Sequence, residues 1–376
     1  MSETQKRDPS DGEPASDGAF SVARPITESD RRDAVASILK KGGDTVIPDL
    51  VAMLFDKSRA VREAVASAFE TLPPDPAIRA LLPLLAEERS EVRNIVIEIL
   101  TRIGARSVDT ILQTLNSRPD DPDVTLFIID ILGDIGDPVA VGAVVPWLTH
   151  AHPNIRNAAV VALGKMGSPA VVNHLRKCFR DEDWICFSAI EALSAIGGQE
   201  AEQALLDMLK NDRGDLFDIG CLEGLGASRA IDRASDIFEI MSGRPIETAQ
   251  RFVETIRRIL DGRRYQLKGK KAADALNWLK SIAFSENPWT SYQAIEVLEL
   301  LGDETATDVL IDLCRENQPE IVRFAAIRAI SVVGETNAAR TALQTIQAPM
   351  EGASSLFVVI SDALRRIQER DRERDL

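Results

Sequence analysis

The chain has 376 residues, of which 45% are hydrophobic and 27% charged, a composition that supports a large hydrophobic core. Its formal net charge of -15 repels phosphate backbones, so we do not expect nucleic acid as a partner. The sequence has no run of 18 apolar residues and no apolar core at its N-terminus, so we expect neither a membrane span nor a secretory signal peptide.

The chain begins with a segment, residues 1–25, that is rich in Ser, Asp, Glu, Gly and Pro. Such a segment has too little apolar surface to offset the entropy lost on ordering, so it predicts a disordered acidic tail. From Thr27 onward apolar residues recur at helical spacing almost throughout. We assign residues 26–370 to one helical array and residues 371–376 to a short charged tail.

A similar segment recurs along this array. It consists of a turn, a branched apolar residue, usually Arg, then apolar residues at helical spacing and usually Gly, as in HPNIRNAAVVALGKMG from His152. The residues at one equivalent core position are Phe69, Leu100, Leu132, Leu163, Leu193, Leu225, Leu298 and Ile330. Except for one long gap, consecutive positions are separated by about 31 residues, and a period of this length indicates a repeat protein.

Each repeat also has an earlier apolar helix, such as VIPDLVAMLF at Val46. One helix pair cannot cover its own apolar face, so neighbouring pairs must stack. We therefore predict an all-α superhelix of about nine to ten helix pairs. Pro48, Pro83 and Pro146 fall within the first helices of their pairs and should bend or loosen them.

The long gap lies between Leu225 and Leu298 and is more than twice the period. We expect one long, irregular unit at about residues 227–271. Its last part, RRILDGRRYQLKGKK at residues 257–271, is the one strongly basic stretch of the chain. This stretch is either a functional loop or a solvated connector, and the sequence leaves both interpretations open.

The repeats resemble the HEAT family, in the short form first named from phycobilisome lyase subunits. Residues 154–167 match the repeat pattern best, and the resemblance covers most of residues 45–350. It implies an α-α superhelix in which the second helix of each pair lines the concave surface.

The resemblance also implies a role for the recurring arginine, which in HEAT repeats braces the turn between the two helices through hydrogen bonds to acids or carbonyls. The residues that match it are Arg62, Arg93, Arg156 and Arg323. Other repeats have a different residue at this position, namely Thr125, Cys186, Asp218 and Ser291. We expect the turns of these repeats to be less firmly braced.

Residues that carry catalysis form no recognisable pattern. The histidines His150, His152 and His174 lack the His-Glu pairs by which deoxyhypusine hydroxylase, a HEAT-like enzyme, holds iron. The sequence contains no G-x-S-x-G, phosphate-loop or dinucleotide-binding motif. The four cysteines stand far apart, which favours a reducing compartment, so we expect a cytoplasmic protein without metal or cofactor.

The second helix of each pair has a face opposite its core. We count the branched residue after the turn as position 0, so core positions are 0, 4, 7, 8 and 11, and positions 2 and 6 lie on the far side. An apolar residue at position 2 and an acid at position 6 recur as Leu126/Asp130, Phe187/Glu191, Ile219/Glu223 and Tyr292/Glu296. These four apolar–acid pairs favour a groove that binds a basic amphipathic helix or an extended basic peptide, although the apolar residues could instead pack against neighbouring repeats.

The sequence thus predicts a non-catalytic scaffold or adaptor that binds a partner protein or peptide on its concave face. Two alternatives stay open. One is a phycobilin lyase-type subunit acting on a phycobiliprotein, which the repeat resemblance permits. The other is a regulatory module of a bacterial signalling pathway.

Overall fold

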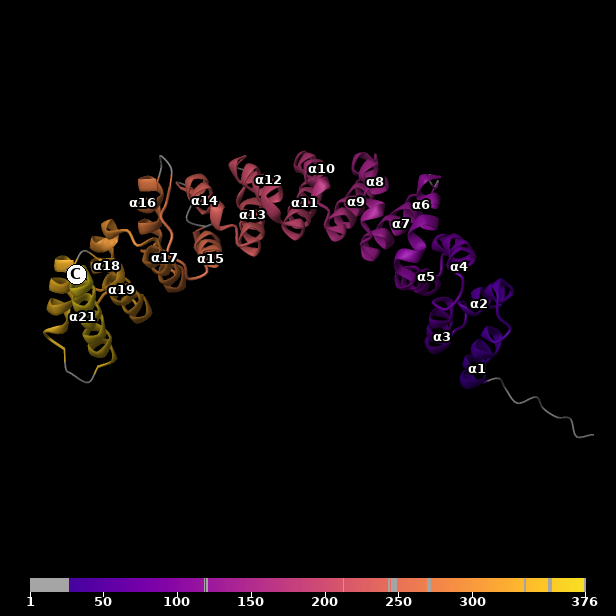
Figure 1. Cartoon of the computed structure of the whole chain (residues 1–376), viewed down its shortest axis with the longest axis horizontal. Helices are drawn as coiled ribbons and strands as arrows, with labels where there is room; N and C mark the ends of the chain where they lie inside the picture. The colour runs from indigo at the N-terminus through magenta and orange to yellow at the C-terminus, as the bar shows by residue number, and fades with distance from the viewer. Residues whose placement is uncertain are drawn as a thin grey trace, which may run out of the picture.

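The computed structural model describes residues 27–374, apart from 118, 120, 212, 243, 245–248, 269–271, 335 and 351–353. The predicted tail at residues 1–25 therefore lies outside the described residues. Within the described part, every regular element is a helix, and the helices follow one another along a curved arc (Figure 1). The predicted all-α superhelix is confirmed.

The array begins with α1 (Glu28–Leu39), which packs on α3, and ten helix pairs follow in the described residues. The first helices of these pairs are α2 (Ile47–Met53), α4 (Pro74–Leu81), α6 (Val108–Asn116), α8 (Val141–Val144), α10 (Val172–Leu175), α12 (Gly198–Lys210), α14 (Ala234–Met241), α16 (Ala272–Ile282), α18 (Thr307–Leu313) and α20 (Thr336–Gln347). The second helices are α3 (Arg59–Phe69), α5 (Ser90–Ile103), α7 (Pro122–Ile135), α9 (Pro153–Met166), α11 (Asp183–Ile196), α13 (Asp215–Ala227), α15 (Ala249–Leu260), α17 (Pro288–Leu301), α19 (Glu320–Val333) and α21 (Ser355–Arg374).

Short 3-10 segments extend most of the first helices. They are η1 (Asp44–Val46), η2 (Leu82–Ala86), η3 (Gly104–Ser107), η4 (Pro138–Ala140), η5 (Val145–Thr149), η6 (Pro169–Val171), η7 (Arg176–Arg180), η8 (Ile231–Arg233) and η10 (Glu304–Ala306). Pro83 and Pro146 each occupy the second residue of such a segment, so the expected disturbance of the helix occurs there as a tightening into 3-10 turns. Pro48 instead stands at the start of α2. At this position a backbone N–H would have no hydrogen-bond partner within the helix, so proline is tolerated.

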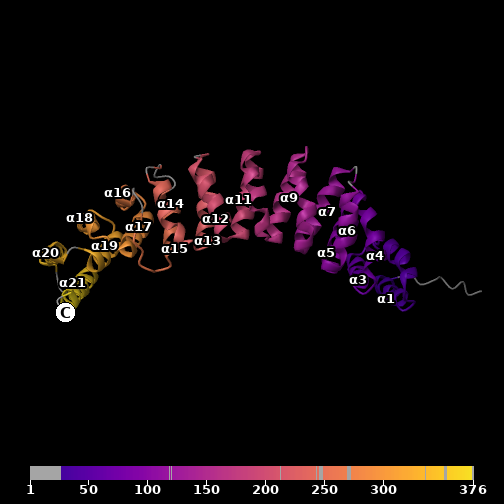
Figure 2. The same cartoon turned by 45° about the horizontal axis from the view of Figure 1, so that its top comes forward.

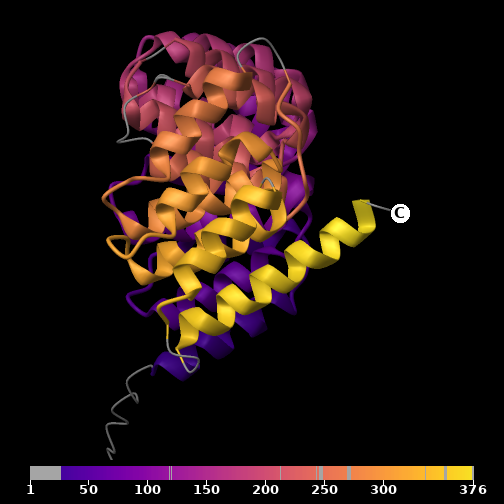
Figure 3. The same cartoon turned by 90° about the vertical axis from the view of Figure 1, so that its left-hand side faces the viewer.

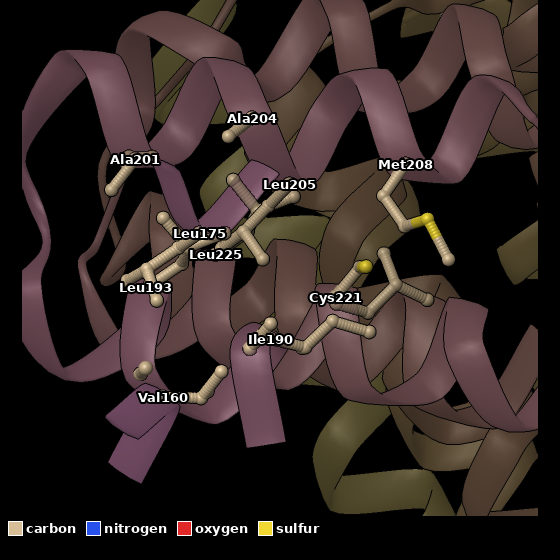
Figure 4. Packing of buried hydrophobic residues seen from close by; sticks show 14 of the residues in the cluster. Val160, Leu175, Ile190, Leu193, Ala201, Ala204, Leu205, Met208, Cys221 and Leu225 are labelled. Atoms are coloured by element: carbon tan, nitrogen blue, oxygen red, sulfur yellow. The ribbon is translucent and has the colours of Figure 1, made fainter. Parts of the chain in front are cut away.

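The first helices lie on the convex side of the arc and the second helices on the concave side (Figures 1 and 2). From α5 to α19, each second helix packs between those of the two neighbouring repeats. The core is therefore one continuous layer along the arc. Leu193 on α11, Leu205 on α12 and Leu225 on α13 meet in this layer (Figure 4).

Second helices in the middle of the arc approach each other closely. A Cβ placed on Gly133 of α7 would lie 2.7 Å from the Cα of Ala162 on α9. A Cβ placed on Gly164 of α9 would lie 2.7 Å from the Cβ of Ala192 on α11. Only glycine fits at these two contacts, so the spacing of three consecutive second helices depends on them.

The long gap between Leu225 and Leu298 contains one additional helix pair, α14 and α15, before the pair of α16 and α17. Helix α15 packs between α13 and α17 as in the other repeats. Its Ile256 is fully buried and follows Leu225 by one normal period. The unit expected over residues 227–271 thus consists of a regular helix pair followed by a long connector. The extra length lies in the connector after Leu260, which allows the helix pair itself to keep the regular geometry.

The C-terminal helix α21 continues through Arg374, past the boundary that the sequence analysis placed at residue 370. Ion pairs one turn apart, such as Arg365–Glu369 at 2.7 Å and Arg366–Asp362 at 2.9 Å, support a helix in this charged stretch. In the end-on view, α21 (yellow) runs obliquely at the end of the arc (Figure 3). None of the described helices is long and apolar enough to cross a membrane.

Candidate protein-binding surface

All eight predicted binding residues lie on second helices, on the side away from the buried core positions. They are Leu126 and Asp130 on α7, Phe187 and Glu191 on α11, Ile219 and Glu223 on α13, and Tyr292 and Glu296 on α17. None of them is fully buried, and the carboxylates of Glu191 and Glu223 are exposed. Because α11 and α13 pack directly on each other, two apolar–acid pairs lie side by side on the concave surface.

Phe187 also belongs to the contact between repeats. Its ring stacks on the ring of Phe217 on α13, with centroids 4.3 Å apart and planes inclined by 5°. The guanidinium of Arg213 lies 4.7 Å from the centroid of Phe217. Phe187 is therefore a half-buried side chain that stacks on the next repeat and offers only part of its surface to a partner.

Two of the four acids pair with arginines of the chain itself. The carboxylate of Glu223 lies 3.3 Å from Arg251 on α15. The carboxylate of Glu296 lies 3.4 Å from Arg328 on α19 and accepts a hydrogen bond of 3.1 Å from the hydroxyl of Tyr292. Partly exposed ion pairs of this kind contribute about 0–1 kcal/mol each, so a basic partner can compete for these acids.

The other two acids differ in their surroundings. Glu191 is exposed and forms no ion pair with any described residue. Asp130 is half-buried, and its desolvation raises the pKa of its carboxyl, although the nearby Lys165 opposes the shift. Between them, α9 has Asn157 and Val161 at positions 2 and 6, and α15 has Gln250 and Glu254 there. Complete apolar–acid pairs therefore adjoin each other only on α11 and α13.

Three large exposed apolar side chains on the second helices were not predicted from the sequence. Trp184, Leu216 and Trp289 are 41%, 69% and 62% exposed. Each stands one residue before position 0 of its helix, at position -1, three residues before the apolar member of an apolar–acid pair. Each of these residues, followed by the apolar residue and the acid of its pair, has the helical spacing i, i+3 and i+7. Position -1 can therefore be recognised from the sequence once it is included in the repeat pattern.

The recurring arginines contact the turn between the two helices of their own repeat. Arg62 donates to the carbonyl of Asp56 at 2.7 Å, Arg93 to that of Glu87 at 2.9 Å, and Arg323 to that of Cys314 at 3.3 Å. Arg156 donates to the carbonyl of His150 at 3.1 Å and also reaches the next repeat, where it forms an ion pair with Asp181 at 2.7 Å.

In two repeats that lack this arginine, an arginine from the following repeat braces the turn instead. In the repeat of Cys186, Arg213 donates to the carbonyls of Phe179 and Asp181. In the repeat of Asp218, Arg244 donates to the carbonyl of Leu209 at 2.7 Å and its guanidinium lies 3.4 Å from the Asp218 carboxylate. The expected weaker bracing is therefore wrong for these two repeats, because the arginine comes from a neighbouring turn.

The other two substitutions behave differently. The hydroxyl of Ser291 donates to the carbonyl of Ser285 at 2.9 Å, which replaces the arginine contact with a shorter side chain. The hydroxyl of Thr125 bonds only within its own helix, to the carbonyl of Asp121 at 3.2 Å. A depression of about 600 Å³, lined in part by Trp147 and His150, lies beside Thr125. This repeat fits the expectation of a less firmly braced turn.

The basic stretch at residues 257–271 divides into two parts. Its beginning forms the last turn of α15. In the connector that follows, the backbone N–H of Tyr265 donates to the carbonyl of Leu300 at 3.0 Å, and its hydroxyl lies 3.0 Å from Oγ of Ser235. Ser235 Oγ also accepts from the N–H of Lys268 at 2.9 Å. The described connector therefore bridges two repeats, whereas residues 269–271 lie outside the described residues.

The stacked helix pairs define an α-solenoid, and the comparisons with known proteins agree with this class. The family model of HEAT repeats matches residues 108–186 and 240–331, so these parts of the chain are HEAT repeats. No curated protein sequence matches the chain.

Several solved structures are similar in fold. Kap121p bound to RanGTP superposes with a TM-score of 0.52 at 13% identity, over 91% of this chain and 45% of Kap121p. Importin beta gives 0.51 at 10% identity, over 89% of this chain and 55% of importin beta. This chain thus spans about half the length of these two proteins. The complex of CpcE and CpcF of phycocyanin lyase from Nostoc sp. PCC7120 gives 0.34 at 16% identity, over 69% of this chain and 94% of the matched chain.

Proposed function

We propose that the chain is a non-catalytic scaffold or adaptor, and that it binds a basic segment of a partner protein on the concave surface of α11 and α13. One observation carries this proposal. The apolar–acid pairs Phe187/Glu191 and Ile219/Glu223 lie on adjacent second helices. A segment that crosses both helices would meet apolar surface and carboxylates together, which favours lysine or arginine beside apolar side chains.

The fold class supports a binding role in general. Stacked repeats form long curved surfaces, and such surfaces suit extended contacts with another protein. Kap121p, which shares the fold over most of this chain, was solved with RanGTP bound. The net charge of -15 adds long-range attraction for a basic partner.

We also propose a cytoplasmic location, on the basis of the cysteines. All four are free and buried. Burial raises the pKa of Cys178 and Cys186 to about 11, so both thiols are neutral at physiological pH. Cysteines of this kind act as small apolar side chains, and their use in a core fits a reducing compartment.

Affinity purification with quantitative mass spectrometry tests the proposed function. Three baits are compared: the wild-type chain, Glu191→Lys/Glu223→Lys, and the control Glu200→Lys/Asp232→Lys. The control changes two exposed acids of α12 and η8 by the same charge, and its two positions are likewise one repeat apart. We expect a partner that is captured by the wild type and the control and lost with the concave variant. A partner lost only with the control would place the binding surface on the first helices instead.

A further inference from the structure

The three exposed side chains Trp184, Leu216 and Trp289 occupy the same place in their repeats. Each is the second residue of its second helix, at position -1. Given the helical rotation of about 100° per residue, positions -1, 2 and 6 lie within one narrow arc opposite the core. They therefore form one column along the helix, with two apolar residues followed by an acid.

Three second helices carry this column. The residues are Trp184, Phe187 and Glu191 on α11, Leu216, Ile219 and Glu223 on α13, and Trp289, Tyr292 and Glu296 on α17. Earlier helices do not: the same positions read Glu91, Asn94 and Glu98 on α5 and Asn154, Asn157 and Val161 on α9. The apolar surface is therefore a local feature and not a by-product of the repeat.

The columns of α11 and α13 adjoin each other, whereas α15, with Gln250 at position 2, separates them from α17. We propose that Trp184 and Leu216 are the anchoring residues of this surface, and that they bind the apolar face of a basic amphipathic helix from a partner protein. This proposal rests on the proposed function and identifies which residues and which kind of segment carry the binding. Exposed, adjacent apolar side chains of this size are uncommon on a protein surface without a partner.

The indole of Trp184 is held in position before any partner arrives. Its Nε1 donates a hydrogen bond of 2.8 Å to a carboxylate oxygen of Glu182. Phe187 lies three residues further along α11 and belongs to the same apolar surface. Its ring is held in place by stacking on Phe217. An aromatic anchor that is already ordered loses little entropy on binding, and aromatic residues contribute a large share of interface energy.

Carboxylates border this apolar surface at both ends. The exposed acids at the N-terminal ends of the two helices are Glu182, Asp183 and Asp215, and the acids further along are Glu191 and Glu223. Three arginines lie near these acids, and each is already engaged. Arg213 contacts Asp183 at 2.6 Å and the ring of Phe217. Arg156 lies 3.3 Å from Glu182, and Arg251 lies 3.3 Å from Glu223. This charge pattern favours lysine or arginine on the partner and disfavours nucleic acid, an anionic membrane or a second copy of this acidic chain.

The spacing of the two columns favours a helical partner. Packed helices lie about 8–10 Å apart. A helix that crosses α11 and α13 rises by about 1.5 Å per residue, so it covers this distance in about five to seven residues. Apolar residues that recur every seven residues would therefore meet the Trp184 column and the Leu216 column in turn.

A synthetic peptide tests this inference with the full-length chain. The probe is a fluorescent 18-residue peptide in which leucines form one helical face and lysines the other, measured by fluorescence anisotropy. Trp184→Ala/Leu216→Ala leaves the net charge unchanged, so a loss of affinity reflects the apolar contact. We expect binding at least tenfold weaker than wild type. The matched control Val139→Ala/Val358→Ala changes two side chains that are 67% and 59% exposed and lie outside the columns. It should bind as the wild type does.

Two further peptides separate charge from apolar contact. A peptide with glutamate in place of lysine should not bind. A peptide with glutamine in place of leucine should bind more weakly than the probe. It should also bind equally well to the wild type and to Trp184→Ala/Leu216→Ala.

Equal affinity of the wild type and Trp184→Ala/Leu216→Ala for the leucine–lysine probe would overturn the inference. So would concentration-dependent dimers of the wild type that dissociate in the variant, because a second copy would then cover the surface. A natural partner that depends on Glu191 and Glu223 but not on Trp184 and Leu216 would overturn this inference and leave the proposed function intact.

Discussion

Arg156 on α9 and Asp181, in the turn before α11, form a two-point ion pair between consecutive repeats. Nε lies 2.8 Å from one carboxylate oxygen and Nη2 lies 2.7 Å from the other. The same guanidinium donates to the carbonyl of His150 in its own repeat. One side chain therefore fixes both a turn and the relative position of two repeats. Arg31 and Asp56, which have the same separation in sequence, form a similar contact at 2.8 Å.

This ion pair should make stability depend on pH. The hydrogen bond from Arg156 is the main cause that lowers the pKa of Asp181. A carboxyl whose pKa is lowered by folding stabilises the fold above its ordinary pKa near 4, and this contribution is lost as the pH falls through its lowered value. We expect Arg156→Gln to reduce the free energy of unfolding by about 1–3 kcal/mol at pH 7. Urea unfolding at pH 7 and pH 3 should show a smaller difference at the lower pH, and a difference that did not change with pH would contradict the assignment.

The stacking of Phe187 on Phe217 gives a second prediction. Phe187→Ala should destabilise the chain by about 2–3 kcal/mol, less than full burial would give, because the side chain is only half-buried. Thermal unfolding followed by circular dichroism measures this change. Trp184→Ala, whose side chain is exposed, serves as the comparison and should shift the midpoint little. If both variants unfolded at the same temperature, the stacked contact would have no role in joining the repeats.

The close approach at Gly164 gives a third prediction. Alanine normally stabilises a helix relative to glycine by about 1 kcal/mol. In Gly164→Ala, however, the new Cβ would lie 2.7 Å from the Cβ of Ala192, and relieving this overlap costs about 1–3 kcal/mol. We expect a net loss of stability.

Gly142→Ala in α8 is the matched control for Gly164→Ala. A Cβ at Gly142 has no neighbour within 4 Å, so this change should be neutral or stabilising. Chemical unfolding of both variants decides the matter. A Gly164→Ala variant at least as stable as Gly142→Ala would show that α9 and α11 can move apart freely.

The sequence was sufficient to predict the repeat architecture because its period determines which residues face the core. Leu163 and Leu225, for example, occupy the predicted core position and are fully buried. The column on the concave face was predicted in part, since positions 2 and 6 follow from helical geometry alone.

The contacts between repeats were harder to predict because they depend on how the helices stack. Arg213 and Arg244 stand in turns, outside the repeated pattern, so nothing in the period marks them as braces for the preceding repeat. The pairing of Glu223 with Arg251 likewise depends on the approach of α13 and α15. Part of the acidic surface expected from the sequence is therefore paired with arginines from neighbouring helices.

The most direct test of the proposed function is the dissociation constant of the identified partner for the full-length chain. Glu191→Lys/Glu223→Lys removes two carboxylates from the concave surface and should weaken binding about tenfold or more, since several modest charge contacts are lost and reversed together. The wild-type affinity should also fall as salt is added. The charge-matched control Glu200→Lys/Asp232→Lys should bind as tightly as the wild type. An equal loss in both variants, or an affinity that neither variant changes, would contradict binding on the concave surface.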